Sequence, residues 1–223
     1  MEDVTSRSMW IAPSRYPDIR YWTVEHWKAL TFASEADWQI AIEIFEDRIN
    51  YRYLDAVKQL QESDDRYYVE HRQRRFGFSM MALDCLLIET LAQFYNGLPE
   101  SPSRENSSFY ISFLWQGSFI LKSAFDNESK AKLFYKTIRN GILHQAETKD
   151  SSTIWFRDKE QTELPFIVTP DSKGLRIYWL NFHRLVIEEF IAYCEALKKK
   201  DPLSMRNAFK RKMDHICRLQ VSL

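Results

Sequence analysis

The segment 134–144 carries three side chains that could act together on a phosphodiester. Its sequence, FYKTIRNGILH, places Arg139, Asn140 and His144 in the pattern R-N-x-x-x-H. Arginine is a permanent cation, asparagine donates and accepts hydrogen bonds, and histidine exchanges protons near neutral pH. These groups could cleave RNA without a metal ion, because RNA supplies its own nucleophile, the 2′-hydroxyl.

Each of the three side chains suits a different step of that chemistry. His144 can accept the 2′-hydroxyl proton or protonate the leaving 5′-oxygen. Arg139 can hold the phosphate and offset its charge in the transition state, and Asn140 can orient the histidine or bind a phosphate oxygen. On a helix, Arg139 and His144 lie about 140° apart, and Asn140 lies between them on the face of His144.

The same helix also needs a side that faces the core. Phe134, Ile138 and Ile142 recur at intervals of four and supply it. Leu143 points away from this stripe and lies beside the polar residues. An apolar residue on a polar face indicates that this face meets another surface.

Two acids stand in the strongly apolar segment 76–95 and are further candidates. Asp84 and Glu89 are conspicuous there, because a buried carboxylate needs a cationic partner. Either acid could reach Arg139 or His144 and set its orientation. Alternatively, each could be a boundary residue that faces solvent or a loop.

A basic segment precedes these acids. It contains Arg72, Arg74 and Arg75, which could follow the phosphate backbone of RNA or could form a solvated helix face. We expect no metal site and no cofactor. The three cysteines are widely spaced and form no C-x-x-C pair, and the other histidines lack partners at ligand spacing.

The periodicity of apolar residues predicts the elements that position the motif. Ser34 is expected to cap the first long helix, the sequence Asn96-Gly97 to end the second, and Asn181 to cap the fifth. Alternation after residue 150 predicts strands instead. The expected helices span about 35–62, 66–96, 109–125, 128–146, 182–199 and 203–219, and the expected strands span 153–157, 165–169 and 175–179.

The chain is therefore predicted to be mainly all-α, with a small β-hairpin at about 153–179. The 223 residues have 45% hydrophobic content, enough for one core, and 31 basic residues balance 31 acidic ones. We expect residues 1–34 to form an aromatic-rich arm, residues 35–200 to form the bundle, and residues 201–223 to form a helix packed on the bundle. Trp22 and Trp27 of the arm are expected to pack on helices. With neither a leader nor a membrane span in the pattern, we expect a cytoplasmic protein.

The motif and the order of helices resemble the HEPN domain (higher eukaryotes and prokaryotes nucleotide-binding). Its signature is R-x(4–6)-H, often with a polar residue after the arginine, and Arg139–His144 matches with four intervening residues. The resemblance covers about residues 35–200 and is to the prokaryotic branch found among toxin and phage-defence ribonucleases. The arm and the hairpin depart from the simplest family pattern.

The resemblance implies an up-and-down helical bundle that forms a homodimer through the motif helix. It also implies metal-independent endoribonuclease activity on RNA, and a nucleotidyltransferase-type antitoxin as a possible partner. Two alternatives remain open at this stage. The chain could be a non-catalytic HEPN module that binds RNA, nucleotide or a partner protein, or an unrelated helical protein with a chance motif.

Overall fold

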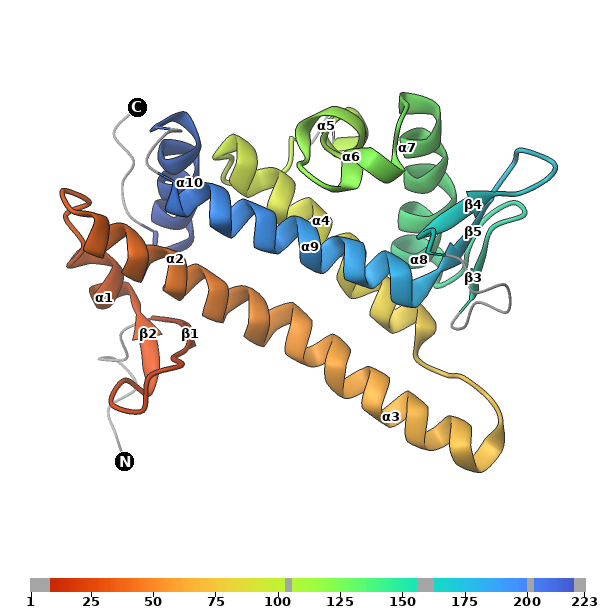
Figure 1. Ribbon diagram of the computed structural model, residues 1–223, viewed down its shortest axis with the longest axis horizontal. Helices are drawn as coiled ribbons and strands as arrows, with labels where there is room; N and C mark the ends of the chain where they lie inside the picture. Colours follow the sequence, from red (N-terminus) through yellow and green to blue (C-terminus); the bar gives the residue numbers. More distant parts are fainter. Residues whose placement is uncertain (1–8, 103–105, 156–162, 200–202, 219–223) are drawn as a thin grey trace.

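The protein is mainly α-helical, and its long helices run beside one another (Figure 1). The computed structural model describes residues 9–102, 106–155, 163–199 and 203–218. The predicted fold class is confirmed. The α-helices are α1 (Val24–Lys28), α2 (Glu35–Ile49), α3 (Asp55–His71), α4 (Gly77–Asn96), α5 (Asn106–Ser112), α6 (Leu121–Ala124), α7 (Glu128–Phe134), α8 (Asn140–Gln145), α9 (Trp179–Lys198) and α10 (Leu203–Ile216).

Within the described residues, three short π-helical turns join some of these helices. They are η2 (Asn50–Leu54), η3 (Phe113–Gly117) and η4 (Tyr135–Arg139). The first makes α2 and α3 one continuous rod, which starts as predicted at Ser34, whose hydroxyl accepts from the Asp37 backbone N–H. The long diagonal rod in Figure 1 is this segment.

The predicted end of the first helix at about residue 62 is wrong, and so is the predicted single helix 66–96. The rod continues to His71 and turns at Arg72, whose φ is 57°. The buried carboxylate of Asp64 accepts hydrogen bonds from the backbone N–H groups of Arg75 and Phe76. Asp64 therefore faces inward to fix the turn between α3 and α4, which a polar loop signal does not reveal.

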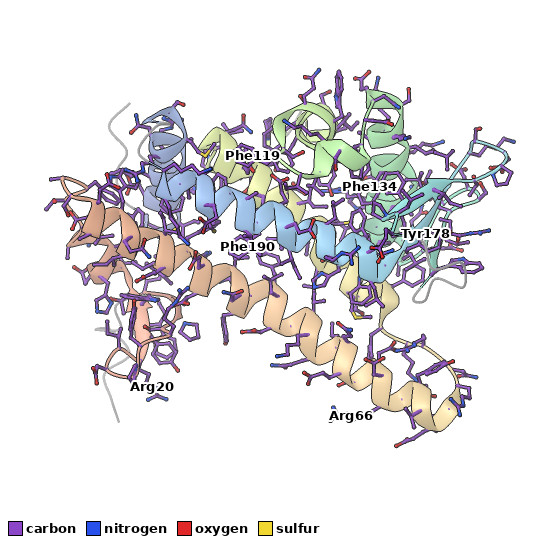
Figure 2. All side chains as sticks on the ribbon, viewed as in Figure 1. Arg20, Arg66, Phe119, Phe134, Tyr178 and Phe190 are labelled. Atoms are coloured by element: carbon purple, nitrogen blue, oxygen red, sulfur yellow. The ribbon has the colours of Figure 1, made fainter. Side chains whose placement is uncertain are left out.

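Helix α4 is the centre of the bundle and packs against α9, α10 and the motif helix. In the part of the chain that the structure describes, it is the one helix long and apolar enough to cross a membrane, and half of its apolar stretch is buried inside the protein. Gly97 ends it in the left-handed conformation, as predicted. Phe134 and Phe190 lie between helices in Figure 2, whereas Arg66 lies on the outside of α3.

The predicted continuous helix 109–125 is broken. It divides into α5, η3 and α6, because Glu189 of α9 is fully buried at the break and accepts from the backbone N–H groups of Phe119, Ile120 and Leu121. A carboxylate there satisfies N–H groups that the first turn of α6 leaves unpaired.

The predicted hairpin forms part of a three-stranded sheet. Strands β4 (Phe166–Val168) and β5 (Leu175–Tyr178) pair antiparallel as predicted, but β3 (Thr153–Trp155) pairs parallel with β5 on its other edge. Residues 156–157 of the predicted first strand lie outside the described residues. Asn181 does not cap α9, which begins at Trp179. Its side-chain amide instead donates to the Leu164 carbonyl.

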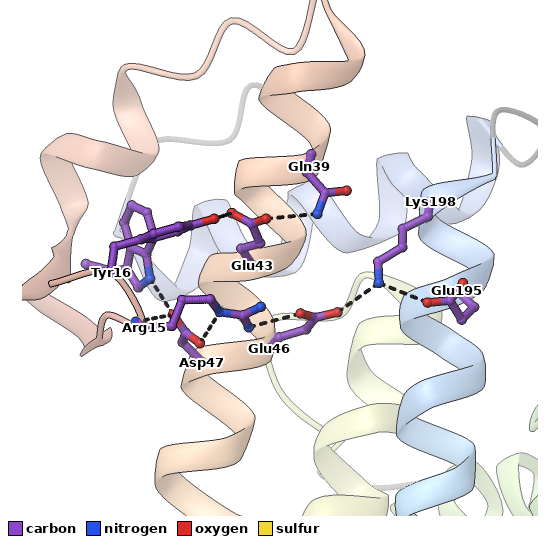
Figure 3. Close-up of polar contacts among 9 residues, drawn as sticks. Arg15, Tyr16, Gln39, Glu43, Glu46, Asp47, Glu195 and Lys198 are labelled. Atoms are coloured by element: carbon purple, nitrogen blue, oxygen red, sulfur yellow. Dashed lines mark hydrogen bonds and ion pairs between the residues drawn. The ribbon is translucent and has the colours of Figure 1, made fainter. Parts of the chain in front are cut away.

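The described part of the N-terminal arm forms a small hairpin and a short helix. Strands β1 (Trp10–Pro13) and β2 (Tyr21–Thr23) pair antiparallel, and α1 follows. Trp22 and Trp27 are buried as predicted, and their indole N–H groups donate to Asp47 and Asp214. Figure 3 shows how ion pairs extend this attachment: Arg15 contacts Glu46 and Asp47 of α2, and Lys198 of α9 contacts Glu46.

Candidate functional site

The motif helix is built from α7, η4 and α8 rather than from one regular α-helix. Asn127 caps its start by accepting from the Lys130 backbone N–H. The predicted core stripe of Phe134, Ile138 and Ile142 is buried. The π-helical turn η4 ends at Arg139, so the motif begins where the helix changes its period. Such turns are rare in proteins and frequent at functional sites.

Arg139 is the centre of a polar cluster. Its Nη2 lies 2.7 Å from Glu89 Oε2, and its Nη1 lies 3.1 Å from Asn140 Oδ1 and 3.4 Å from His144 Nε2. Only 9% of the arginine side chain is exposed. The sequence reasoning placed Arg139 and His144 on the two flanks of one face, and the length of the arginine side chain brings them into contact.

His144 is the exposed member of the cluster and lies at the end of α8. A guanidinium N–H can only donate, so the contact with Arg139 requires an unprotonated Nε2 that accepts. The tautomer that makes this contact carries its proton on Nδ1. In this state the ring can act as a base once Arg139 releases Nε2.

Glu89 reaches Arg139, as one sequence hypothesis expected. The pair is largely buried, with 9% of the Arg139 side chain and 14% of the Glu89 side chain exposed. Burial opposes the charge on Arg139, but the hydrogen bond and the charge of Glu89 outweigh it and raise the pKa of the guanidinium above its usual value. Arg139 also lies over the rings of Tyr135 and Tyr110, at 5.3 and 5.9 Å from their centroids.

Asp84 belongs to a different cluster. Its buried carboxylate lies 2.7 Å from His183 Nδ1 and accepts from the indole N–H of Trp179 at 3.2 Å. Burial raises the pKa of Asp84, against the influence of His183. Asp84 and Glu89 are five positions apart, which places them on different faces of α4. The hypothesis that Asp84 supports the motif is therefore not upheld by its contacts.

The three candidate RNA-binding arginines differ in their surroundings. Arg74 pairs with Asp64 and Asp65, and Arg75 lies over the Tyr67 ring at 3.4 Å, so both help to shape the turn after α3. Arg72 is exposed at that turn and lies 5.9 Å from the Tyr68 ring centroid. No contact joins this turn to Arg139 or His144 among the interactions of the described residues.

A chain of hydrogen bonds behind Glu89 was not foreseen from the sequence. Ser101 donates its hydroxyl to Glu89 Oε1 at 2.8 Å, and Gln93 donates its amide to Ser101 Oγ at 2.9 Å. Lys212 of α10 donates to Gln93 Oε1 and to the Pro99 carbonyl. The sequence could have indicated that Glu89 and Gln93 lie on the same face of one helix, because they are four positions apart. It contains no local pattern that links either residue to Ser101 in the loop or to Lys212 on α10.

Replacing Lys212 with methionine is expected to change how stability depends on pH. Burial is the main cause that lowers the pKa of Lys212, to about 8 from an ordinary value of 10.5. Between these values the unfolded chain retains a proton that the folded protein has lost, so this residue makes stability rise with pH. The free energy of unfolding of the wild type minus that of Lys212→Met, measured by urea unfolding from pH 7 to 10.5, should therefore become more positive as pH rises. A constant difference would contradict it.

Gly141, inside the motif, has no room for a side chain. A Cβ there would lie 2.3 Å from the Glu147 carbonyl oxygen and 3.3 Å from the Lys149 backbone nitrogen. Gly141→Ala is therefore expected to lower the free energy of unfolding by about 1–3 kcal/mol in urea denaturation, by forcing α8 and the segment after it apart. Gly117→Ala is the matched control, because its Cβ would meet nothing closer than 3.4 Å. Equal effects of the two substitutions would refute this reading.

The site thus combines an exposed imidazole, a carboxamide and a buried cation held by a carboxylate. Among the residues that the structure describes, no three His, Cys, Asp or Glu side chains gather as they would around a metal ion. Comparison of the chain with protein-family models, with curated proteins and with solved structures finds no match.

Proposed function

We propose that this protein is a HEPN-like, metal-independent endoribonuclease that cleaves RNA through its 2′-hydroxyl. The observation that carries the proposal is the contact of one arginine, Arg139, with both Asn140 and His144. Residues one and five positions apart on a helix are close together, and here a single guanidinium group contacts both partners. The hydrogen bond from Arg139 to Glu89 supports the proposal further, because it holds the guanidinium in place on the side away from His144.

In the proposed reaction, His144 Nε2 removes the proton from the 2′-hydroxyl of the substrate. The 2′-oxygen forms a bond to phosphorus, and the bond from phosphorus to the 5′-oxygen breaks. The leaving 5′-oxygen takes a proton from water or from the His144 of a second copy. The products carry a 2′,3′-cyclic phosphate and a 5′-hydroxyl.

Arg139 would supply positive charge as negative charge builds on the phosphate oxygens. Its Nη1 faces the exposed side of the cluster through Asn140 and His144, while Nη2 faces Glu89. When a phosphate displaces His144 from Arg139 Nη1, Nε2 of the histidine becomes available to accept a proton. The arginine at the same time acquires an anionic partner. Substrate binding and activation of the base would then be one event.

The active form would be a homodimer whose two motif helices face each other. Two exposed apolar side chains of α4, the helix that carries Glu89, support this assembly: Phe78 and Leu86 are each 40% exposed. They are two turns apart, and at 100° per residue they fall on the side of α4 that carries Glu89. A second copy would cover them and bring a second His144 towards the same cleft.

A non-catalytic HEPN module is the second candidate, and the burial of Arg139 favours it. With 9% of its side chain exposed and Glu89 as a partner, this arginine could serve only to stabilise the bundle. The same surface would then bind a partner protein or a second copy without cleaving RNA.

The test is cleavage of mixed cellular RNA by purified protein, in EDTA, with His144→Ala measured in parallel. We expect cleavage by the wild type alone, products with 2′,3′-cyclic phosphate, and no cleavage of DNA of the same sequence. Light scattering should give the mass of a dimer. If both proteins are inert, the non-catalytic module is the better reading, and if both cut equally, the activity lies elsewhere.

The biological setting that we propose is a toxin or phage-defence ribonuclease in the cytoplasm, held inactive by an antitoxin of the nucleotidyltransferase type. Induced expression of the wild type should then arrest growth, whereas His144→Ala should be tolerated at equal protein levels. Arrest by both proteins would separate toxicity from RNA cleavage.

A further inference from the structure

The hydrogen-bonded chain that ends at Lys212 joins the C-terminal helix to the motif, although the two are far apart in sequence. Four side chains connect them in order: Lys212, Gln93, Ser101 and Glu89, with donor–acceptor distances of 2.7, 2.9 and 2.8 Å. Glu89 then accepts from Arg139 at 2.7 Å. Every link is short enough for a normal hydrogen bond.

The cation at one end fixes the direction of the whole chain. The Lys212 ammonium can only donate, so it must face the carbonyl oxygen of the Gln93 amide. The Gln93 amino group then faces Ser101, which turns the serine hydroxyl towards Glu89. If the Gln93 amide were reversed, its oxygen would accept the serine proton, and Glu89 would lose this bond.

Lys212 is an unusual residue for a purely structural position. It is 6% exposed, and in the described part of the chain its ammonium makes no ion pair. Its acceptors are the Gln93 amide and the Pro99 carbonyl, both neutral. Burial and the nearby charge of Arg48 oppose the charge on Lys212, and Glu100 favours it. An apolar side chain of similar length would fill the space without the penalty of burying a charge.

Helix α10 does not need Lys212 for its attachment. Arg206 of the same helix makes two hydrogen bonds to Glu35 and one to the Leu197 carbonyl, and Asp214 accepts from the Trp27 indole. These contacts hold α10 at both ends. What Lys212 adds is a directed contact with the residues behind Glu89.

We infer that Lys212 is a positioning residue for Arg139, acting through Gln93, Ser101 and Glu89. This inference rests on the proposed ribonuclease function for its meaning, but the coupling itself does not require RNA cleavage. With the serine hydroxyl donated to Oε1, the carboxylate of Glu89 is held with Oε2 towards the guanidinium. Loss of either Lys212 or the hydroxyl frees Glu89 to rotate, and Arg139 loses its fixed position beside His144.

The activity test compares Ser101→Ala and Lys212→Met with two controls. Each of the two should lower kcat for RNA cleavage by about 10- to 100-fold with KM changed less than twofold, since a small misplacement of a catalytic group has an effect of this order. The double variant should be no slower than the slower single one, because both break the same chain. Ser101→Thr keeps the hydroxyl and should keep the rate.

Arg206→Met is the matched control for folding. It removes a cation that is equally buried on the same helix, 6% exposed, and whose hydrogen bonds to described residues go to Glu35 and the end of α9 rather than to Gln93. It should destabilise the protein and leave kcat unchanged. If Lys212→Met does not fold, Ser101→Ala carries the test, because Ser101 lies in a half-buried loop position outside the helices.

A second readout does not depend on nuclease activity. The Nε–Hε signal of Arg139 in a ¹⁵N-labelled sample, assigned by its loss in Arg139→Lys, should shift in Ser101→Ala and Lys212→Met, but not in Ser101→Thr or Arg206→Met. If it shifts and the wild type cuts no RNA, the proposed function fails and the positioning role stands. If the wild type cuts RNA while signal and kcat are unchanged in both variants, the positioning role is wrong.

Discussion

Replacing His144 with alanine is expected to lower kcat for RNA cleavage by about 10²–10⁴-fold, the usual contribution of general acid–base catalysis. The imidazole is exposed and contributes no core contact, so the fold and the melting temperature should be unchanged. The measurement is the initial rate of cleavage of a defined oligoribonucleotide, with circular dichroism to verify folding.

The matched control for this variant is His215→Ala. His215 is also an exposed histidine in the last turn of a helix, but that helix is α10. Its replacement should leave the rate within experimental error. Equal loss of activity in both variants would show that histidine removal acts on stability or assembly rather than on the chemistry.

Replacing Glu89 with alanine should have the largest effect on stability. It leaves the guanidinium of Arg139 buried without its carboxylate, and breaking a buried ion pair in this way typically costs about 3–5 kcal/mol. Cleavage should fall as well, because Arg139 loses its fixed position. Urea unfolding at pH 7 measures the first effect, and the rate of cleavage measures the second.

A double-mutant cycle tests whether the stability effect comes from the pair. Glu89→Ala together with Arg139→Ala should be more stable than the sum of the two single losses predicts, since no unpaired charge remains. Lys132→Ala is the surface control: it breaks an exposed pair with Glu128 and should change stability by less than about 1 kcal/mol. Additive losses at Glu89 and Arg139 would mean that the two side chains do not stabilise each other.

The sequence predicted the fold class and most helices because apolar residues at intervals of three and four were strong in α2, α4, the motif helix and α9. It failed where a buried polar group decides the geometry. Asp64 reads as a helix breaker and instead closes a turn from inside the helix. Glu189 breaks a segment that is apolar enough to be one helix, from a position far along the chain.

The residues of the candidate site could likewise be predicted only where the signal is local in the sequence. Arg139, Asn140 and His144 could be named because they lie in one short pattern, and Glu89 because an acid in an apolar run needs a partner. Nothing local distinguished Glu89 from Asp84, since their different partners come from other elements. Lys212 follows two other basic residues, Lys210 and Arg211, and such a run is typical of a solvated helix face. Only the position of α10 against α4 reveals that this cation is turned inward.

The π-helical turn before Arg139 has a consequence for protein engineering and for comparing sequences. Each residue advances a helix by about 100°, so one residue added or removed there would turn the motif by that angle relative to Phe134 and the core behind it. Deleting one residue from 135–139 should give a more regular helix whose motif no longer faces Glu89. A change in the length of this helix would therefore disturb the site even if every motif residue were kept.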